Sequence, residues 1–446
     1  MEGGLGAPTR HPLRYDQPDF YDEEKLDAEL RRVFDICHGC RRCFNLCDSF
    51  PRLFDLIDDS ESGELDSVDS ADFKPVVDAC TLCDLCFMVS CPYVPPHEFD
   101  LDYPHLMLRY RAVENRKGKV PFTDREIAKT DRNGKLAGSV ASLANWGTSL
   151  DNKLGRRVLE KAAHIHPEAK LPEYHGKTFA MRAKSAPPTV NKEAPAFGRK
   201  VVLYATCFVN YNNPDIGLTT QKVLAHNGVE TEVVYPECCG MPMLELGDLD
   251  GVAAKAQRVA EALGPWIDKG YDIVAMVPSC ALMLKFEWPL LQPENEAIAK
   301  LAKHTSDVSQ YVVDIAGKEG LAEGLKPLDG GVSVHLACHA RAQNIGPKAV
   351  EMLRLIPEID LAVIERCSGH GGAWGTKEPY FPVALKVGRP AARAALKNNK
   401  AYLTSECPLA REHILQGMEK LQGEPVQVSP STHPIELIAR AYGFVD

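Results

Sequence analysis

Two cysteine runs near the N-terminus constrain this chain more than any other feature of its sequence. Residues 37–47 read CHGCRRCFNLC and residues 80–92 read CTLCDLCFMVSCP, so that each run opens with a C-x2-C-x2-C triplet. The gap before the fourth cysteine is three residues in the first run and four in the second. A triplet of this kind wraps backbone around an iron–sulfur cube, whereas zinc sites favour paired C-x2-C knuckles. The runs therefore predict iron–sulfur ligation.

When two such triplets occur together, the fourth ligand of each cluster comes from the opposite run. We therefore expect two 4Fe–4S clusters with crossed ligation. The predicted ligand sets are Cys37, Cys40, Cys43 and Cys91 for one cluster, and Cys80, Cys83, Cys86 and Cys47 for the other. The stretch DEEKLDAELRRVFDI, which leads into the first run, has the apolar spacing of an amphipathic helix.

The cysteine count and the charge limit the classes of protein that fit this sequence. The chain has 15 cysteines, an odd number, and its first twenty residues lack the apolar core of an export signal. We therefore expect a cytoplasmic protein, because clustered cysteines in a reducing compartment bind metals more often than they form disulfides. The net charge of −10 argues against nucleic-acid binding. No run approaches the roughly 20 apolar residues of a membrane span. We therefore expect any association with the inner face of a membrane to be peripheral, through a partner, and the sequence leaves a peripheral amphipathic contact open.

The pattern of apolar residues changes after residue 198, where short apolar runs alternate with stretches of helical spacing. Six runs have the length of a strand and end in cysteine: KVVLYATC, TEVVYPECC, DIVAMVPSC, VSVHLAC, DLAVIERC and AYLTSEC. Alternating strands and helices predict a parallel sheet with crossover helices, and parallel strands end at one edge of their sheet. The cysteines are therefore expected to gather at that edge.

The six runs form two sets of three, which indicates an internal duplication. Corresponding positions lie 131, 129 and 127 residues apart, in the pairs Cys207 and Cys338, Cys239 and Ser368, and Cys280 and Cys407. We expect an α/β fold of duplicated βαβ half-domains with parallel sheets, preceded by an α-helical ferredoxin-like domain. The expected divisions are an N-terminal extension (1–32), a di-cluster ferredoxin-like domain (33–110), a helical connector and linker without a ligand cluster (111–197), and two cysteine-rich repeats (198–328 and 329–446).

The first repeat carries four cysteines in its strand-end turns, and the second carries three. Gly240 follows a pair of cysteines and lets the backbone approach closely, so this turn can present thiolates to two metal atoms. We expect a further iron–sulfur cluster at Cys207, Cys238, Cys239 and Cys280. Whether the second repeat holds a cluster, at Cys338, Cys367 and Cys407, is left open. His339 and His370 are candidate ligands there, although such histidines are more often hydrogen-bonded polar residues.

Two C-x2-C-x2-C runs followed by two cysteine-rich CCG repeats resemble the iron–sulfur subunit family of anaerobic glycerol-3-phosphate dehydrogenase. The resemblance begins near residue 33 and rests also on CFVNYN (207–212), CCGMP (238–242) and AWGTKEPY (373–380). It implies an electron-transfer component of an oxidoreductase that takes electrons from a flavin-dependent dehydrogenase, helps to attach it to the membrane, and passes the electrons toward quinone. The sequence has no G-x-G-x-x-G after a strand and no Walker loop, so we expect the flavin on a partner.

The heterodisulfide reductase relatives of that family suggest an alternative function. Each of their CCG repeats uses five cysteines, in the form C…CC…C-x2-C, to hold a non-cubane cluster that cleaves a disulfide. Here Met283 stands in place of the fifth cysteine of the first repeat, and Ser368 and Ala410 replace cysteines in the second. The alternative is an oxidoreductase that acts on a thiol, a disulfide or another small substrate at an incompletely ligated iron. A sensor or scaffold is a third interpretation, and the sequence identifies no catalytic residue.

Overall fold

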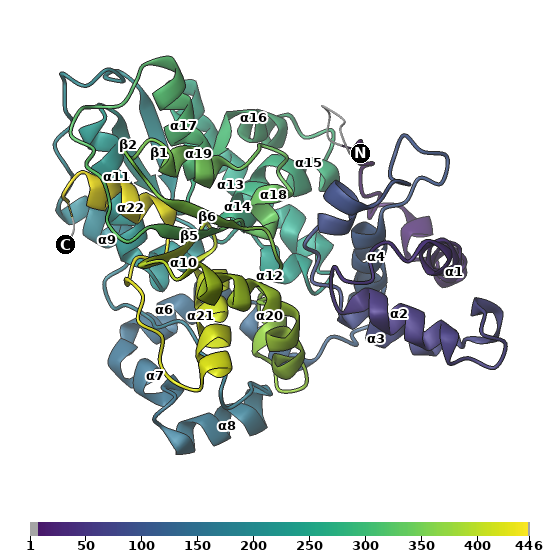
Figure 1. Ribbon diagram of the computed structural model, residues 1–446. Helices are drawn as coiled ribbons and strands as arrows, with labels where there is room; N and C mark the ends of the chain where they lie inside the picture. Colours follow the sequence, from purple (N-terminus) through teal and green to yellow (C-terminus); the bar gives the residue numbers. More distant parts are fainter. Residues whose placement is uncertain (1–7, 445–446) are drawn as a thin grey trace.

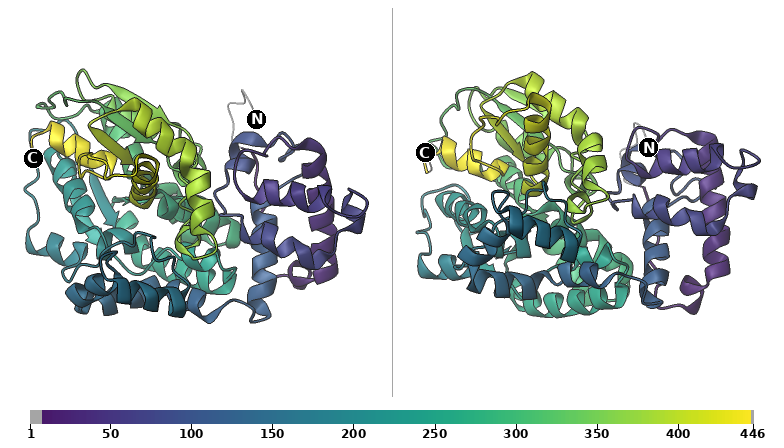
Figure 2. Two further views of the ribbon diagram at one scale, coloured as in Figure 1. Left: turned by 60° about the horizontal axis from the view of Figure 1, so that its bottom comes forward. Right: turned by 90° about the horizontal axis from the view of Figure 1, so that it is seen from below.

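The computed structural model describes residues 8–444, which form a small helical domain beside a larger α/β body (Figure 1). The helical domain stands at one end of the molecule, and both cysteine-rich repeats lie in the body (Figure 2). None of the helices in the described residues is long and apolar enough to cross a membrane.

The helical domain is built on α1 (Glu23–Cys40). Asp22 caps its start by accepting a hydrogen bond from the Lys25 N–H at 3.0 Å. The helix ends where Arg41 adopts a left-handed φ of 52°, so the first two cysteines of the first run occupy its last turn. The other elements are η1 (Pro18–Tyr21), α2 (Ser49–Asp58), η2 (Leu65–Ser67), η3 (Ser70–Phe73), α3 (Lys74–Asp78), the π-helical turn η4 (Cys86–Ser90) and α4 (Tyr103–Arg116). The expected α-helical N-terminal domain is confirmed.

Five helices connect this domain to the sheets: α5 (Phe122–Ile127), α6 (Thr130–Ser139), α7 (Ala141–Thr148), α8 (Lys153–Ala163) and α9 (Phe179–Ser185). The buried Arg156 of α8 donates hydrogen bonds to the carbonyl oxygens of His166 at 2.6 Å and Ala169 at 2.7 Å. One side chain thus fixes the chain where it leaves α8. The outer faces of α6 to α8 expose several large apolar side chains.

The first repeat contains a four-stranded parallel sheet in the order β2-β1-β3-β4. Its strands are β1 (Lys200–Tyr204), β2 (Glu230–Val234), β3 (Asp272–Ala275) and β4 (Thr305–Asp307). The first three are the predicted strands, whereas β4 was not predicted because its sequence, Thr-Ser-Asp, has no apolar run. The helices are α10 (Cys207–Tyr211), α11 (Pro214–His226), α12 (Met241–Leu244), α13 (Leu249–Asp268), α14 (Pro278–Leu282), the π-helical η5 (Met283–Glu287), α15 (Trp288–Leu291), α16 (Glu296–His304) and α17 (Val308–Lys318).

The second repeat contains a three-stranded parallel sheet in the order β6-β5-β7. Its strands are β5 (Val332–His335), β6 (Leu361–Ile364) and β7 (Tyr402–Ser405), all at predicted positions. Because this order matches β2-β1-β3 of the first repeat, the duplicated parallel half-domains are confirmed. The helices are α18 (Cys338–Arg341), α19 (Lys348–Leu353), η6 (Trp374–Thr376), α20 (Phe381–Asn398), α21 (Pro408–Gln422) and α22 (Pro434–Ala441).

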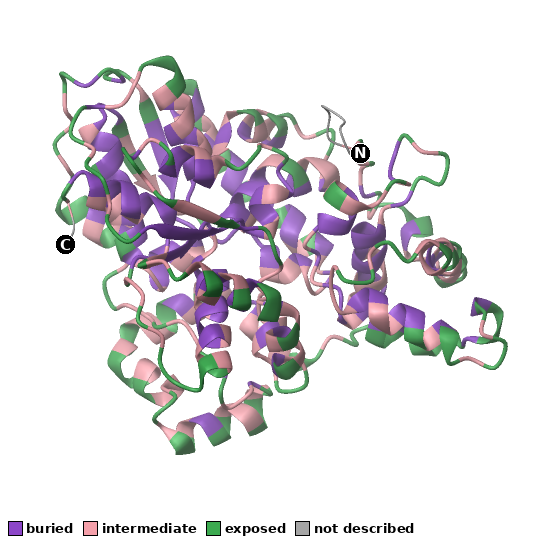
Figure 3. Cartoon of the chain, viewed as in Figure 1, coloured by how far each residue is buried: buried purple, intermediate pink, exposed green. Residues whose placement is uncertain are grey.

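The two repeats share a hydrophobic core. The last helix, α22, packs against α11 of the first repeat, and its Ile435 and Ile438 are fully buried in the same core as Val223. His433 caps this helix by accepting a hydrogen bond from the Ile435 N–H at 3.2 Å. Buried residues run through both sheets and the helices around them (Figure 3). The C-terminal helix of the second repeat therefore completes the core of the first.

A buried ionic network joins the helical domain to the body. The Arg10 guanidinium donates to Asp102 at 2.7 Å, to Asp84 at 2.8 Å and to Glu287 at 3.4 Å. Burial by itself would raise the pKa of Asp102, but Arg10 and His105 outweigh that effect and hold it at about 2. Asp84 lies in the second cysteine run and Glu287 in the first repeat, so the network fixes this run against the body.

We expect Arg10→Met to lower the free energy of unfolding by about 3–5 kcal/mol, because it removes the buried cation that Asp84, Asp102 and Glu287 share. Urea unfolding of anaerobically purified protein, followed by tryptophan fluorescence, measures this change. Arg32→Met is the matched control. Arg32 pairs with Glu29 in an exposed ion pair, whose loss should cost about 1 kcal/mol or less. Equal urea midpoints for the two variants would contradict the role assigned to Arg10.

Candidate metal centre

The two N-terminal cysteine runs differ by one residue, and the backbone absorbs the difference in a π-helical turn. In the second run, the Cys91 N–H donates to the Cys86 carbonyl oxygen at 2.8 Å, five residues back, across η4. In the first run, Cys43 begins an ordinary turn in which the Leu46 N–H donates to its carbonyl oxygen at 2.9 Å. The longer gap therefore changes the turn without displacing Cys91 from the site.

The eight thiols of these runs fall into two groups, each containing cysteines of both runs. The thiol of Cys37 interacts electrostatically with Cys91, Cys43 and Cys40, and the thiol of Cys47 interacts with Cys83 and Cys80. We name them the outer group (Cys37, Cys40, Cys43 and Cys91) and the inner group (Cys47, Cys80, Cys83 and Cys86). This grouping has the crossed pattern expected from the sequence, while iron ligation itself stays a prediction.

Burial and neighbouring thiols make ionisation of these cysteines unfavourable. Burial, followed by the charges of Cys91 and Cys40, raises the pKa of Cys43 to about 12. Similar causes raise the pKa of Cys37 and of Cys86. Thiols that resist ionisation together are stabilised as thiolates when a bound cation shares them. The donor set therefore fits iron–sulfur ligation.

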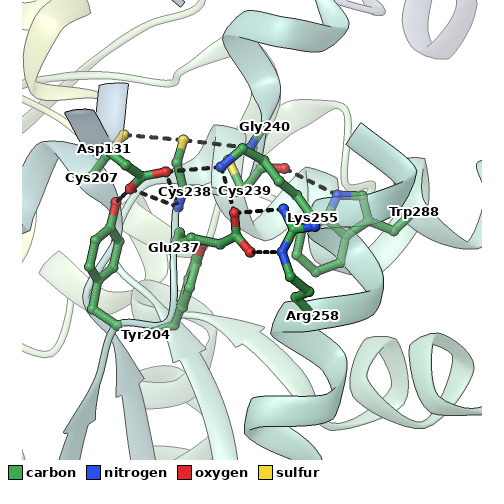
Figure 4. Close-up of polar contacts among 11 residues, drawn as sticks. Asp131, Tyr204, Cys207, Glu237, Cys238, Cys239, Gly240, Lys255, Arg258 and Trp288 are labelled. Carbon is green, nitrogen blue, oxygen red and sulfur yellow. Dashed lines mark hydrogen bonds and ion pairs between the residues drawn. The ribbon is translucent and has the colours of Figure 1, made fainter. Parts of the chain in front are cut away.

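The first-repeat group (Cys207, Cys238, Cys239 and Cys280) lies at the carboxyl edge of the first sheet. Figure 4 shows Cys207, Cys238 and Cys239 of this group. The Cys238 and Cys207 sulfur atoms are 3.5 Å apart, and those of Cys239 and Cys280 are 3.3 Å apart. Gly240 has a left-handed φ of 86°, which lets the chain turn directly after the cysteine pair. Hydrogen bonds from neighbouring thiols lower the pKa of Cys238, although burial opposes this shift. Four thiols thus lie close together at this edge, and iron ligation by them stays a prediction.

Two connector residues, Thr130 and Asp131, also contact this group, and no motif in the sequence predicts these contacts. Both carboxylate oxygens of Asp131 accept from the Cys238 N–H at 3.1 Å, and one accepts from Lys255 Nζ at 2.9 Å (Figure 4). The Thr130 hydroxyl hydrogen-bonds with the thiols of Cys207 and Cys238. No local pattern could have identified Thr130 and Asp131, because they lie more than 70 residues before the group in the sequence.

The second-repeat group (Cys338, Cys367 and Cys407) lies between the inner group and the first-repeat group. The Cys338 thiol interacts electrostatically with Cys83 as well as with Cys367 and Cys407. The Cys407 thiol, whose pKa burial raises to about 11, also interacts with Cys280. All three cysteines are half-buried. Within residues 8–444, no three Cys, His, Asp or Glu side chains are gathered tightly enough to hold a single metal ion.

The two candidate histidine ligands occupy different surroundings. His339 uses both ring nitrogens in hydrogen bonds, with Ser279 Oγ at 2.8 Å and with the Leu82 carbonyl oxygen at 3.2 Å. Burial lowers the pKa of His370 to about 3, so its imidazole is neutral, and its ring centroid lies 6.3 Å from that of His413. The geometry favours a hydrogen-bonding role for His339. A ligand role for either histidine stays a prediction.

A cavity of about 530 Å³ lies away from the cysteine groups. Its lining includes Asp272, Lys303, Tyr311 and Lys348, and it contains no cysteine. A much smaller hollow, of about 10 Å³, is bordered by Leu82 and other residues at the junction of the helical domain and the first repeat. This second space is about the size of one water molecule.

Comparison with known proteins agrees with these features. The CCG family (Cysteine-rich domain) matches residues 201–285. The chain is 28% identical to a component of the anaerobic glycerol-3-phosphate dehydrogenase of Escherichia coli, over 71% of this chain and 76% of that protein. It is 28% identical to a component of the fumarate reductase (CoM/CoB) of Methanothermobacter marburgensis, over 55% and 47% of the two chains. It is 26% identical to a component of the dihydromethanophenazine:CoB–CoM heterodisulfide reductase of Methanosarcina barkeri, over 61% and 66%.

The resemblance inferred from the cysteine pattern is therefore confirmed. The similar proteins are subunits of dehydrogenase and reductase complexes, which supports an iron–sulfur electron-transfer role with redox partner proteins.

We expect Asp131→Ala to weaken iron retention by the first-repeat group about 10–100-fold, the usual cost of losing a residue that orients a metal ligand. Iron release to a chelator, followed anaerobically by absorbance, measures this change. Asp124→Ala is the control, because Asp124 is also a partly buried connector carboxylate but pairs with Lys377 at 2.8 Å. Identical release curves for the two variants would refute the role of Asp131.

Proposed function

We propose that this chain is an iron–sulfur electron-transfer subunit that relays electrons between a flavin-dependent dehydrogenase and a quinone or another redox acceptor. The observation that carries the proposal is the continuity of the four cysteine groups. Cys86 of the inner group interacts with Cys43 of the outer group. Cys83 interacts with Cys367, and Cys407 with Cys280. Each group thus borders the next, from the helical domain to the first sheet.

Each group supplies thiolate donors that suit iron–sulfur clusters. In this proposal the outer and inner groups each hold a 4Fe–4S cluster, and the first-repeat group holds a further one. The second-repeat group has three thiols, and a redox titration of the Cys338→Ser variant determines whether it holds a cluster. Iron–sulfur clusters, when bound to these cysteine groups, supply one-electron redox chemistry, which suits electron transfer from a two-electron flavin.

The outer group offers a surface for a redox partner. Its cysteines are half-buried, and Phe44, which follows Cys43, is 48% exposed. Val89, within the turn that leads to Cys91, is also exposed. Apolar side chains around a partly accessible redox site favour docking of another protein. We therefore place the dehydrogenase or acceptor contact at the outer group.

The connector offers a second surface, which we propose contacts an anionic membrane. On α6, α7 and α8, which lie side by side at one edge of the body (Figure 1), Trp146 is 64% exposed and Leu154 is 72% exposed. Residues 111–197 contain 17 Lys and Arg against 9 Asp and Glu, in a chain of net charge −10. Exposed apolar side chains on short helices with a basic excess favour the interface of an anionic bilayer.

Anaerobic purification with iron and acid-labile sulfide analysis, followed by a redox titration with electron paramagnetic resonance, tests the main proposal. We expect at least about eight irons per chain, since two 4Fe–4S clusters require four each. A lower content after reconstitution would exclude the two-cluster assignment. Addition of a reduced flavoprotein dehydrogenase should reduce the signals, and their indifference to every such donor would argue for a structural role.

The same titration on Cys338→Ser determines whether the second-repeat group is occupied. Selective loss of one signal, with the signals of the other groups retained, is expected if the group holds a cluster. An unchanged spectrum with all iron assigned elsewhere would show that the second repeat is empty.

Co-sedimentation with vesicles tests the connector surface. We expect binding to vesicles of mixed phosphatidylglycerol and phosphatidylcholine, and a loss of about tenfold or more when both Trp146→Ser and Leu154→Ser are introduced, given the apolar area that each side chain buries. Val363→Ser, which changes an exposed apolar residue on β6, is the control. Absence of binding by the unmodified protein would leave the surface to a protein partner and disprove the membrane proposal.

A further inference from the structure

One side chain touches the segments that carry three of the four cysteine groups. His339 follows Cys338 in α18 and is 8% exposed. Its Nδ1 lies 2.8 Å from Ser279 Oγ, and Ser279 directly precedes Cys280. Its Nε2 lies 3.2 Å from the carbonyl oxygen of Leu82, which stands between two cysteines of the inner group.

The contact with the Leu82 carbonyl shows which ring nitrogen of His339 carries a hydrogen. A carbonyl oxygen can only accept, so the Nε2 of His339 carries the hydrogen and donates it to Leu82. Nδ1 forms its hydrogen bond with the hydroxyl of Ser279, a group that can donate or accept. The two ring nitrogens of His339 therefore form hydrogen bonds with two different parts of the molecule.

The contact to Leu82 lies where the backbone is strained. Leu82 has a φ of 48° and Asp84 a φ of 61°, both in the left-handed region that residues other than glycine rarely adopt. Strain of this kind persists only where surrounding contacts enforce it. Arg10 holds the Asp84 side chain at 2.8 Å, and His339 holds the Leu82 carbonyl. We call residues 80–86, which carry Cys80, Cys83 and Cys86, the inner cysteine loop. Each of its two strained residues thus has one buried hydrogen-bonding partner.

A second polar link runs parallel to the first, one helical turn later. Gln343 donates to the carbonyl oxygens of His339 at 3.2 Å and of Pro278 at 3.4 Å. Lys285 Nζ in turn donates to Gln343 Oε1 at 3.0 Å. These bonds tie α18 to the turn that carries Cys280, so the placement of His339 does not depend on its own side chain alone.

We propose that His339 is a positioning residue for the iron–sulfur sites. It sets the conformation of the inner cysteine loop through the Leu82 carbonyl and connects this loop to the Cys280 turn through Ser279. The inference rests on the proposed function, since it concerns the cluster assigned to the inner group. Backbone orientation and hydrogen bonds close to cluster sulfurs set the reduction potential, so His339 controls that potential without being a ligand.

Two variants of His339 separate the two contacts. Asn places an amide near the position of Nδ1, close to Ser279, but is too short to reach Leu82. Gln extends an N–H donor to about the position of Nε2 and can restore the bond to the carbonyl. His335→Asn is the matched control, because His335 is also buried and makes two hydrogen bonds, with Ser405 Oγ at 2.9 Å and the Arg366 carbonyl at 3.0 Å, both within the second repeat.

The measurement is a redox titration followed by electron paramagnetic resonance, with the inner cluster identified by the signal that Cys86→Ser removes. We expect His339→Asn to change the reduction equilibrium of the inner cluster about tenfold, the effect of one neutral hydrogen bond, which is about 59 mV for a one-electron couple. The outer cluster should keep its potential in every variant. His339→Gln and His335→Asn should keep the inner potential of the unmodified protein.

The possible results distinguish this inference from the function on which it rests. If the unmodified protein binds fewer than about eight irons, the two-cluster proposal fails, and the role of His339 fails with it. If the clusters form but His339→Asn titrates like the unmodified protein, the inference is overturned and the proposed function stands. An equal shift in His339→Asn, His339→Gln and His335→Asn would reveal a general packing effect and would also overturn the inference.

Discussion

The convergence of strand-end turns on one buried cysteine loop is the constraint on which the rest of this structure depends. Parallel strands finish at the same edge of a sheet, so each repeat delivers its cysteines to one place. The inner loop enters from the helical domain, and the Cys83 thiol comes within electrostatic reach of Cys367. Crowded thiols resist ionisation in a dry environment, and a bound cation relieves their mutual repulsion. A junction of this composition is therefore suited to a multi-iron centre.

Holding a cysteine loop at this junction requires partners for its charges and backbone groups. Arg10, from the N-terminal extension, compensates Asp84, and Arg111, from α4, donates to the carbonyl oxygens of Val77 and Cys80. The Nε2–H of His339 donates a hydrogen bond to the Leu82 carbonyl oxygen. Arg10, Arg111 and His339, from three parts of the chain, thus fix one loop. A connector residue has a similar role in the first-repeat group, where the Asp131 carboxylate accepts a hydrogen bond from the Cys238 N–H.

Much of the architecture was predictable because it depends on local patterns. The runs before Cys207, Cys239 and Cys280 are apolar and of strand length, and the structure has strands there. The three-residue β4 was missed because it has no such run, and it exists only because β3 offers it a free edge. Thr130 and Asp131 were missed for another reason. They look like an ordinary helix start, and only the fold brings them to a cysteine turn.

The sequence by itself determined how many thiols this protein has, how they are spaced, and where its apolar runs form strands. These properties follow from residue type and from interactions between near neighbours along the chain. The tertiary structure alone decided which cysteine groups border one another, that the last helix completes the first repeat, and that His339 bridges Leu82 and Ser279. Such contacts join residues more than 50 positions apart, and they form only when the core is packed, so no local pattern records them.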